Sequence, residues 1–204
     1  MLNGASSSGK TSLARALQLQ WPGPLLHLGT DSMIQMLPAS YSGMKPSARE
    51  GVQFYNDVDE RGPVVHVRAG SVWRKLETSF ARAVRVLAED AHDLVLDLVL
   101  FEPASLAPYV RELHEQRTYF IGVRCVLPVL EARELAREDR FQNLARAQHE
   151  AVHEPPRCYD LEVDTTSSGP HELARSILQF VDANPRPKAF SLLHSEFFGA
   201  KGPA

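Results

Sequence analysis

The sequence lacks the features that mark secreted, membrane-spanning or nucleic-acid-binding proteins. Its 204 residues include two cysteines, Cys125 and Cys158, and no CxxC pair, which is too few for a disulfide scaffold and fits a reducing cytoplasm. No apolar run approaches the ~18 residues that a membrane span needs, and no charged start followed by a long apolar stretch predicts a signal peptide. Lysine and arginine number 22 against 25 acidic residues, a net charge of -3, so no basic excess favours nucleic acid. We therefore expect a cytoplasmic globular protein with neither a membrane nor a nucleic-acid partner.

What the sequence does contain is an alternation of strand-like and helix-like segments. Its length and its 44% of hydrophobic residues fit one α/β domain. Short apolar runs predict strands at 25–29, 94–100 and 119–125, and the alternation of apolar and acidic residues over 159–164 predicts an edge strand. Helical patterns occupy 9–20, 31–37, 71–91, 131–150 and 171–182. Between 38 and 70, two alternating runs separated by a turn predict a β-hairpin. Such an order of elements is typical of a mostly parallel sheet with helices on both faces.

One segment carries a specific chemical signature, the phosphate-binding pattern GxxxxGK[ST]. The residues predicted to hold a nucleotide are Gly4, Ala5, Ser6, Ser7, Ser8, Gly9, Lys10, Thr11 and the adjoining Ser12. The glycines let successive N–H groups point at phosphate oxygens, and the helix that follows adds a positive dipole end. Lys10 places its charge between the β- and γ-phosphates, and the Thr11 hydroxyl binds Mg²⁺. The pattern therefore predicts ATP and Mg²⁺ as ligands.

The strand that leads into this loop is short. A strand usually has about five residues, whereas Met1, Leu2 and Asn3 alone precede Gly4. We expect either a stunted strand or a printed start that lies downstream of the true one. A chain extended upstream by several apolar residues is then predicted to be more stable.

Several segments spread over most of the chain resemble the chloramphenicol phosphotransferases. In chain order they are residues 2–11, Gly29-Thr30-Asp31-Ser32, the apolar strand that ends in Asp97, the stretch from Gly122-Val123-Arg124-Cys125 through 133–140, Val152-His153-Glu154, and 159–166. The arginine-rich stretch 133–140 together with the closing strand is much more specific to this family than the phosphate loop is. Three features depart from the family: the segment 38–70 matches poorly, Asp97 is followed by Leu98 where the family has a second acid, and the tail beyond Asn184 is an addition.

The resemblance implies an α/β fold of the P-loop NTPase class. It is adenylate-kinase-like, with a five-stranded parallel sheet of order 2-3-1-4-5, helices on both faces and a small β-hairpin insertion. It also implies a small-molecule kinase that transfers the γ-phosphate of ATP to a hydroxyl group, as the family does to the primary hydroxyl of chloramphenicol. One kinase domain is expected over residues 1–183, with the insertion at about 38–70, an arginine-rich lid at about 126–150, and a tail over 184–204.

Two acidic residues are candidates for the chemistry. The resemblance assigns Asp31 to the acceptor hydroxyl as general base, and the alternative is a helix N-cap. Asp97 stands in the apolar run 94–100, where a lone carboxylate is costly to bury unless it meets a cation or donors. We predict that Asp97 and Thr11 hold Mg²⁺, and the alternative is a purely structural acid.

Arg133, Arg137 and Arg140 are spaced i, i+4, i+7, which places them on one face of a helix. We predict that Arg133 and Arg137 neutralise charge in the transition state and that Arg140 binds the nucleotide. A solvated face paired with neighbouring acids is the alternative.

Other interpretations stay open. His149 to His153 reads HExxH, a zinc metalloprotease pattern for which Glu172 could be a third ligand, but two prolines end that helix at once. Met44, Phe54, Tyr55 and Trp73 either line an acceptor pocket or pack in the core. A kinase for another hydroxylated metabolite and a non-catalytic nucleotide-binding protein are the remaining alternatives. The acceptor and the oligomeric state are not fixed by the sequence.

Overall fold

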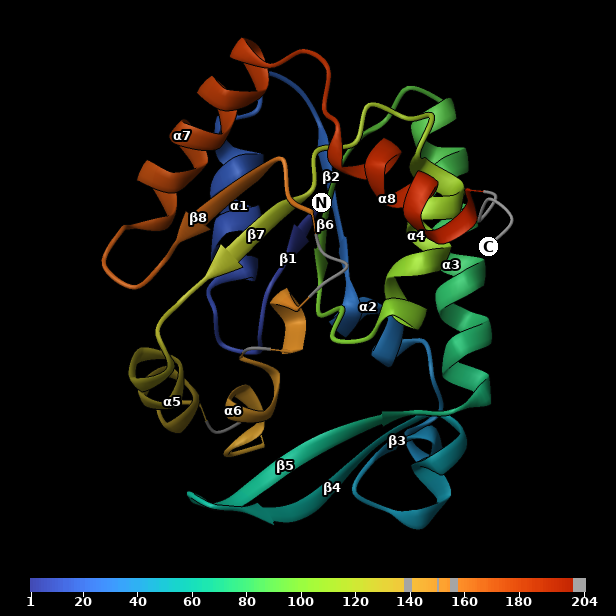
Figure 1. Ribbon diagram of the computed structural model, residues 1–204, viewed down its shortest axis with the longest axis vertical. Helices are drawn as coiled ribbons and strands as arrows, with labels where there is room; N and C mark the ends of the chain where they lie inside the picture. Colours follow the sequence, from blue (N-terminus) through green and yellow to red (C-terminus); the bar gives the residue numbers. More distant parts are fainter. Residues whose placement is uncertain (138–140, 150, 155–157, 200–204) are drawn as a thin grey trace, which may run out of the picture.

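The central feature is a five-stranded parallel sheet (Figure 1). The computed structural model describes residues 1–137, 141–149, 151–154 and 158–199. The strands of the sheet are β1 (Leu2–Asn3), β2 (Leu25–Gly29), β6 (Asp93–Leu98), β7 (Ile121–Arg124) and β8 (Leu161–Asp164). They lie in the order β2-β6-β1-β7-β8, which is 2-3-1-4-5 when the strands of this sheet alone are counted, and each neighbouring pair is parallel. The predicted sheet is confirmed.

Helices cover both faces of the sheet, and each layer buries its own apolar cluster. The helices α1 (Lys10–Gln20) and α7 (Pro170–Ala183) pack on one face over Leu2, Val95 and Ile121. The other face is covered by α3 (Ser71–Glu89), α4 (Pro103–Leu113) and α8 (Ala189–Phe198). The helix α4 was not predicted, although its buried side chains at Leu106, Tyr109, Val110 and Leu113 follow a helical period. No helix of the described part is long and apolar enough to cross a membrane.

The carboxyl ends of the strands carry three shorter helices (Figure 1). These are α2 (Thr30–Gln35) after β2, and α5 (Leu127–Leu135) and α6 (Leu144–Gln148) after β7. The prediction of one helix over 131–150 was wrong for the described residues, since α5 ends at Leu135. A tertiary contact explains the break: the buried Glu134 side chain turns inward and its Oε1 atom accepts a hydrogen bond from Ala145 N–H at 2.8 Å. Asn143, with φ of 64°, begins α6 from the left-handed region.

The segment between α2 and α3 forms a second, smaller sheet below the first (Figure 1). It consists of β3 (Ser42–Gly43), β4 (Val52–Asp59) and β5 (Gly62–Ala69), with single 3-10 turns at Ala39–Tyr41 and Pro46–Glu50. The strands β4 and β5 are antiparallel and pair from Val52 with Ala69 to Asp59 with Gly62. The predicted hairpin is therefore present, and we call β4 and β5 the hairpin below.

The last described helix, α8, packs on the main core. Phe190 and Leu193 of α8 are buried, and the ring of Phe190 meets that of Phe120 edge-on at 5.6 Å. The Asp160 carboxylate accepts hydrogen bonds from the backbone N–H groups of Lys188 and Ala189, at 2.6 and 3.0 Å. These bonds satisfy donors that the first turn of a helix leaves unpaired, so the chain enters α8 in a fixed direction.

Candidate functional site

The phosphate loop runs from the end of β1 to the start of α1, and its shape depends on glycine at two places. A Cβ atom at Gly4 would lie 2.5 Å from the backbone oxygen of Val123 on β7, so only glycine fits this close approach. Gly9 has φ of 87°, in the left-handed region that glycine adopts without strain. Ser7 has φ of 61°, where a residue with a side chain is uncommon. The loop is thus a curled backbone whose following helix begins at Lys10.

Lys10, Thr11 and Asp97 meet where β1 and β6 end. The Lys10 ammonium is almost fully buried; it donates to the backbone oxygen of Ala5 at 2.7 Å and lies 4.0 Å from Asp97 Oδ1. The Thr11 hydroxyl donates to Asp97 Oδ2 at 2.6 Å. The structure therefore brings together the three residues that the sequence predicted for the phosphate and metal site.

The Asp97 carboxylate is kept charged by its neighbours. Burial raises its pKa, but the His27 imidazole, the Lys10 ammonium and the Thr11 hydroxyl together outweigh that effect, so the pKa lies below its usual value. His27 Nε2 lies 3.7 Å from Asp97 Oδ2. Because the charged form is favoured, Asp97 is available as an anionic oxygen ligand.

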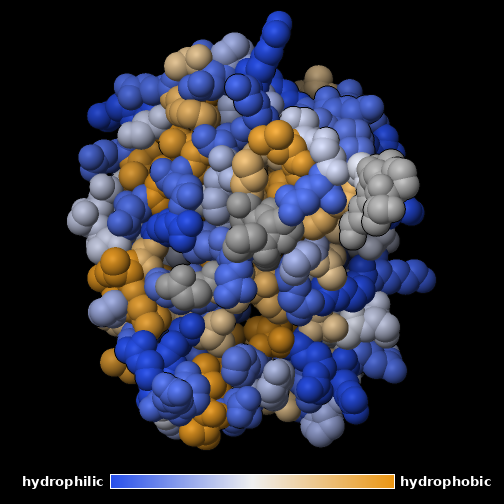
Figure 2. Space-filling view, viewed as in Figure 1, coloured by the Kyte–Doolittle hydropathy of each residue, from blue (hydrophilic) through white to orange (hydrophobic). Residues whose placement is uncertain are grey.

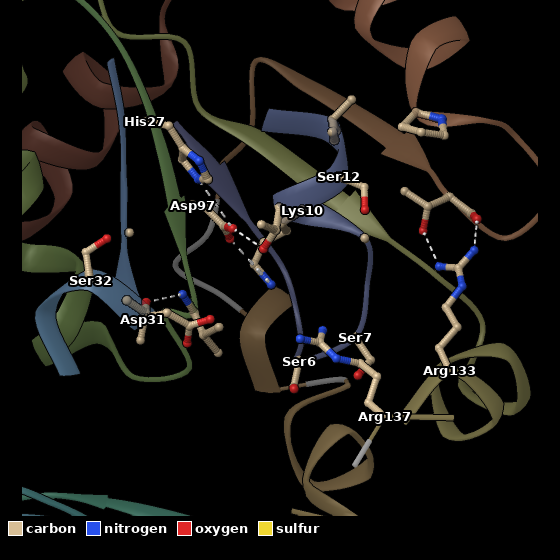
Figure 3. A pocket seen from close by; sticks show the side chains of 18 of the residues that line it. Ser6, Ser7, Lys10, Ser12, His27, Asp31, Ser32, Asp97, Arg133 and Arg137 are labelled. Carbon is tan, nitrogen blue, oxygen red and sulfur yellow. Dashed lines mark hydrogen bonds and ion pairs between the residues drawn. The ribbon is translucent and has the colours of Figure 1, made fainter. Parts of the chain in front are cut away.

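These residues line a cavity of about 490 Å³ that also reaches Asp31 and Ser32 (Figure 3). Asp31 lies in the first turn of α2, whose N-cap is Gly29 and has no side-chain capping bond. The alternative role of Asp31 as the helix N-cap was therefore wrong, because the helix begins one residue earlier, at Thr30. The Thr30 hydroxyl instead accepts a hydrogen bond from Val99 N–H at 3.1 Å, which fixes the start of α2 to the loop after β6.

Two of the three predicted arginines border the same cavity. The Arg133 guanidinium lies at the end of α5 and donates to the backbone oxygen of Thr165 at 2.6 Å and to its hydroxyl at 3.2 Å. Arg137 lies beyond the last residue of α5, so the predicted single helical face was wrong for Arg133 and Arg137. Both side chains nevertheless lie on the α5 side of the loop (Figure 3). Arg140 lies outside the described residues.

The residues of this site that were not predicted include His27, Gln148 and Thr165. His27 is the one polar side chain in the short apolar strand β2, which was a usable signal. Thr165 follows β8, and its hydroxyl donates to the backbone oxygen of Ser8 at 2.7 Å. The Gln148 side chain accepts a hydrogen bond from Ser6 N–H at 2.8 Å. Nothing in the sequence near Thr165 or Gln148 indicates that they approach the loop.

The HExxH pattern does not form a zinc site in the described residues. His149 follows the last residue of α6, and its Nε2 atom lies 3.1 Å from the backbone oxygen of Cys125. His153 lies in a 3-10 turn, and its Nδ1 atom lies 2.9 Å from the Tyr159 hydroxyl. Glu150 lies outside the described residues. No group of three or more metal-binding side chains is found in the part of the chain that the structure describes, and the two histidines do not share one α-helix.

The aromatic residues considered for the acceptor do not border the 490 Å³ cavity. Trp73 is buried in the core, and the ring of Phe54 packs on that of Phe141 at 4.5 Å. Tyr55 stacks on His66 on the hairpin, and Met44 is exposed. Trp73 therefore packs in the core, and Tyr55 packs against another residue of the hairpin, so neither contributes to the lining of this cavity.

Comparisons with known proteins agree with this geometry. The family model described as "Chloramphenicol phosphotransferase-like protein" matches residues 1–182. Two relatives from Mycobacterium tuberculosis, of strains CDC 1551 and H37Rv, are each described as a "Putative O-phosphotransferase". Each is 31% identical over 198 residues, which cover 97% of this chain and 88% of the relative.

Similar solved structures include kinases for several small molecules. A Mycobacterium tuberculosis APS kinase in complex with AMPPNP and APS has a TM-score of 0.58 at 13% identity, covering 89% of this chain and 95% of its own. A Sinorhizobium meliloti gluconokinase has a TM-score of 0.56 at 14% identity, and the match covers 98% of this chain and 95% of the gluconokinase. A shikimate kinase from Acinetobacter baumannii, in complex with shikimate, has a TM-score of 0.55 at 18% identity, and the match covers 90% of this chain and 92% of the shikimate kinase. At such identities the likeness establishes the fold. The chain belongs to the chloramphenicol phosphotransferase-like family and is a P-loop kinase that transfers phosphate to a hydroxyl group of a small molecule.

Proposed function

We propose that this protein transfers the γ-phosphate of ATP to a hydroxyl group of a small acceptor. The reaction requires Mg²⁺ and takes place in the cytoplasm. The observation that carries the proposal is a single cavity that Lys10, Asp97 and Asp31 line together with the phosphate loop. A cation for phosphate, an anionic oxygen for a metal and a carboxylate for a proton are the parts that phosphoryl transfer needs.

The nucleotide side of the site consists of the loop and the arginines. Backbone N–H groups of the phosphate loop and of the start of α1 offer donors and a positive dipole end to the phosphates. The N–H groups of Ser6 and Ser8 are not among them, because they already donate to Gln148 and to the backbone oxygen of Ala5. Lys10 adds a fixed charge. Arg133 of α5 and Arg137, two residues beyond its end, are placed to neutralise charge that develops during transfer. Arg140 is proposed to contact the nucleotide from the same segment.

The Thr11 hydroxyl and the Asp97 carboxylate fit Mg²⁺. Both are hard oxygen donors, and their oxygen atoms lie 2.6 Å apart beside the loop. Mg²⁺ commonly takes one or two protein oxygens and completes its shell with water and phosphate. Thr11 of α1 and Asp97 of β6 would hold the ion, which would supply charge neutralisation to the phosphates.

Asp31 is proposed as the general base. The acceptor oxygen forms a bond to the γ-phosphorus while the bond from that phosphorus to the β-phosphate oxygen breaks, and ADP leaves. The proton of the acceptor hydroxyl passes to the Asp31 carboxylate. Asp31 lies at the carboxyl end of β2 and borders the same cavity as Lys10, which is where ligands of open α/β sheets gather.

Chloramphenicol is the first acceptor to test, because the family model carries that description; if it is the substrate, the enzyme confers resistance to that antibiotic. The test is ATP consumption with a panel of hydroxylated antibiotics and metabolites, compared with Lys10→Ala and with Lys45→Ala as the matched control. Lys10→Ala should lower the rate on the order of 10²–10³, and Lys45→Ala, an exposed lysine ahead of β4, should not. Full activity of a folded Lys10→Ala protein would overturn the proposal, and nucleotide binding without turnover of any acceptor would favour a non-catalytic role.

A further inference from the structure

The short helix α6 contacts two regions that lie far from it in sequence. Gln148 faces the phosphate loop: its Oε1 atom accepts the Ser6 N–H at 2.8 Å, and the two residues are 7% and 8% exposed. Arg146 faces the other way, and its Nη2 atom donates to the backbone oxygens of Gly62 at 3.1 Å and Pro63 at 2.5 Å, at the start of β5. One helix of five residues therefore joins the phosphate loop to the hairpin, and Figure 1 shows α6 between the two.

The hairpin is attached to this segment at more than one point. Val65 N–H of β5 donates to the backbone oxygen of Asn143 at 3.2 Å. Arg146 also pairs with Asp59 at 3.3 Å, and the rings of Phe54 and Phe141 lie 4.5 Å apart. A shift of the hairpin relative to α6 would break these contacts, so the two move together.

The helix α6 is also attached to α5, which in turn bonds to the residue that follows β8 of the main sheet. Glu134 of α5 is buried and accepts the Ala145 N–H at the start of α6. Arg133 of α5 holds Thr165, whose hydroxyl donates to the backbone oxygen of Ser8. The phosphate loop is thus held from α6 at Ser6 and, through α5, at Ser8.

We propose that Gln148 and Arg146 are positioning residues that couple the hairpin to the phosphate loop. The placement of the hairpin on α6 sets the orientation of the Ser6 peptide, and with it the fraction of protein whose loop is ready for phosphate. By reciprocity, nucleotide at the loop stabilises the hairpin in the same placement. This inference rests on the proposed function, because it takes nucleotide as the ligand of the loop.

The physical basis is the cost of releasing one buried donor in a strained loop. Without Gln148 the Ser6 N–H has no side-chain acceptor, and a buried unpaired donor is unfavourable. Ser7, the next residue, has φ of 61°, so the loop gains by relaxing when its neighbour is released. A ligand that needs the unrelaxed loop then binds with an apparent affinity lowered by the fraction that is competent.

The test is a double-mutant cycle in nucleotide affinity. Calorimetric titration with the magnesium complex of AMPPNP compares the unaltered chain, Arg146→Met, Gln148→Met and the double variant. Each single substitution should weaken binding by about 5- to 50-fold. The double variant should bind no more weakly than Gln148→Met, because Arg146 acts through Gln148.

Matched controls come from the hairpin and from the residue that precedes the N-cap of α6. Arg68→Met removes an arginine of β5 that bonds to Gln53 within the hairpin, and Gln142→Met removes a glutamine whose amide bonds to the backbone oxygen of Glu134. Neither contacts the phosphate loop, so both should leave nucleotide affinity within about twofold.

Hydrogen exchange of the Ser6 amide gives a readout that needs no ligand. Its protection should be lost in Gln148→Met and reduced in Arg146→Met. Additive losses of affinity, or a lower melting temperature with unchanged affinity and unchanged Ser6 exchange, would overturn the coupling. If the unaltered chain bound no nucleotide, the proposed function would fail, and Ser6 exchange in Arg146→Met would still decide whether the hairpin controls the loop.

Discussion

Asp31 borders the cavity from the first turn of α2, and it is not the N-cap of that helix, which was the alternative to a catalytic role. Gly29 is the N-cap of that helix, so Asp31→Asn changes no cap and keeps the side-chain shape. As general base, Asp31 should be needed for turnover: Asp31→Asn should lower kcat on the order of 10²–10⁴. Its nucleotide affinity and melting temperature should stay nearly unchanged.

Ser32→Ala is the matched control for this prediction. Ser32 is the next residue of α2 and borders the same cavity, so its loss tests general disturbance of the helix start. Steady-state kinetics of both variants with the acceptor identified by the panel separates the two. Near-normal turnover of Asp31→Asn would show that another group takes the proton.

His153 should make the stability of the fold depend on pH. Burial, and then the charge of Arg124, lower its pKa from 6.5 to about 4. The unfolded chain therefore takes up this proton at a higher pH than the folded chain does. The stabilising contribution is fully present above pH 6.5 and is lost as the pH falls toward 4.

Comparison with His153→Asn isolates this contribution from those of other groups. The free energy of unfolding of the unaltered chain should exceed that of the variant most above pH 6.5, and the difference should shrink by about 1–2 kcal/mol toward pH 4, less than a fully buried ring would give. Urea unfolding at several pH values measures it. A difference that is constant over this range would show that His153 does not titrate as its burial implies.

Among the elements, β2, β6 and β7 were predictable because each lies in a short apolar run, and β8 because its apolar and acidic residues alternate. The order of the sheet followed from the family resemblance. The break between α5 and α6 was not, because it depends on Glu134, a residue that a helical pattern places on the wet face and that the fold buries against Ala145. In the site, the loop motif located Lys10 and Thr11. Gln148 reaches Ser6 across 142 positions in sequence, a contact that no local pattern encodes.

The strand β1 has two residues, and its shortness leaves the first residues of β6 paired with β2 alone. Its residue Leu2 pairs with Asp97, whereas β6 already begins at Asp93. A cavity of about 390 Å³ lies at this end of the sheet, lined by Met1, Leu94 and Tyr119 among others. The Met1 amine is buried there and donates to the backbone oxygen of Tyr119 at 2.7 Å. Burial lowers its pKa from 8.0 to about 5.

Adding four residues of alternating valine and threonine ahead of Met1 should therefore stabilise the fold. The added strand would pair with β6, and a peptide group would replace the buried amine. Because the folded pKa of the amine is depressed, the chain that begins at Met1 loses stability as the pH falls from 8 to about 5. The advantage of the extended chain should grow over the same range, by roughly 4 kcal/mol at pH 5 from the amine alone.

Urea unfolding at pH 8, 6.5 and 5 measures the advantage. An extension of glycine and serine serves as the control, because it removes the amine but forms a strand poorly. It should reproduce the pH dependence without the additional stability at pH 8. Equal stabilities of all three chains at pH 5 would show that neither the amine nor the missing strand pairing matters.

At the scale of the whole molecule, the cavity lies where the central sheet, α2 and α5 come together. The sheet supplies the phosphate loop, Asp97 and His27; α2 supplies Asp31; and α5 supplies Arg133. A ligand that contacts all three ties them together, and a ligand that binds only the folded state raises its stability. The face of the molecule drawn in Figure 2 is mixed in polarity, with apolar patches between hydrophilic ones.

Nucleotide and magnesium should therefore raise the melting temperature together. At a concentration of AMPPNP about 100 times its Kd, binding adds about 2.7 kcal/mol, which for a chain of this size corresponds to a shift of about 5–10 °C. Removing magnesium with EDTA should reduce the shift, because the Asp97 carboxylate then faces the phosphates without a cation between them. Lys10→Ala should reduce the shift as well, since the ammonium held beside Ala5 and Asp97 no longer offsets phosphate charge.

AMP, which lacks the β- and γ-phosphates, is the control ligand and should give a much smaller shift in melting temperature. A shift that is the same with and without magnesium, or as large with AMP as with AMPPNP, would mean that the phosphate loop and the Thr11–Asp97 pair are not what holds the nucleotide.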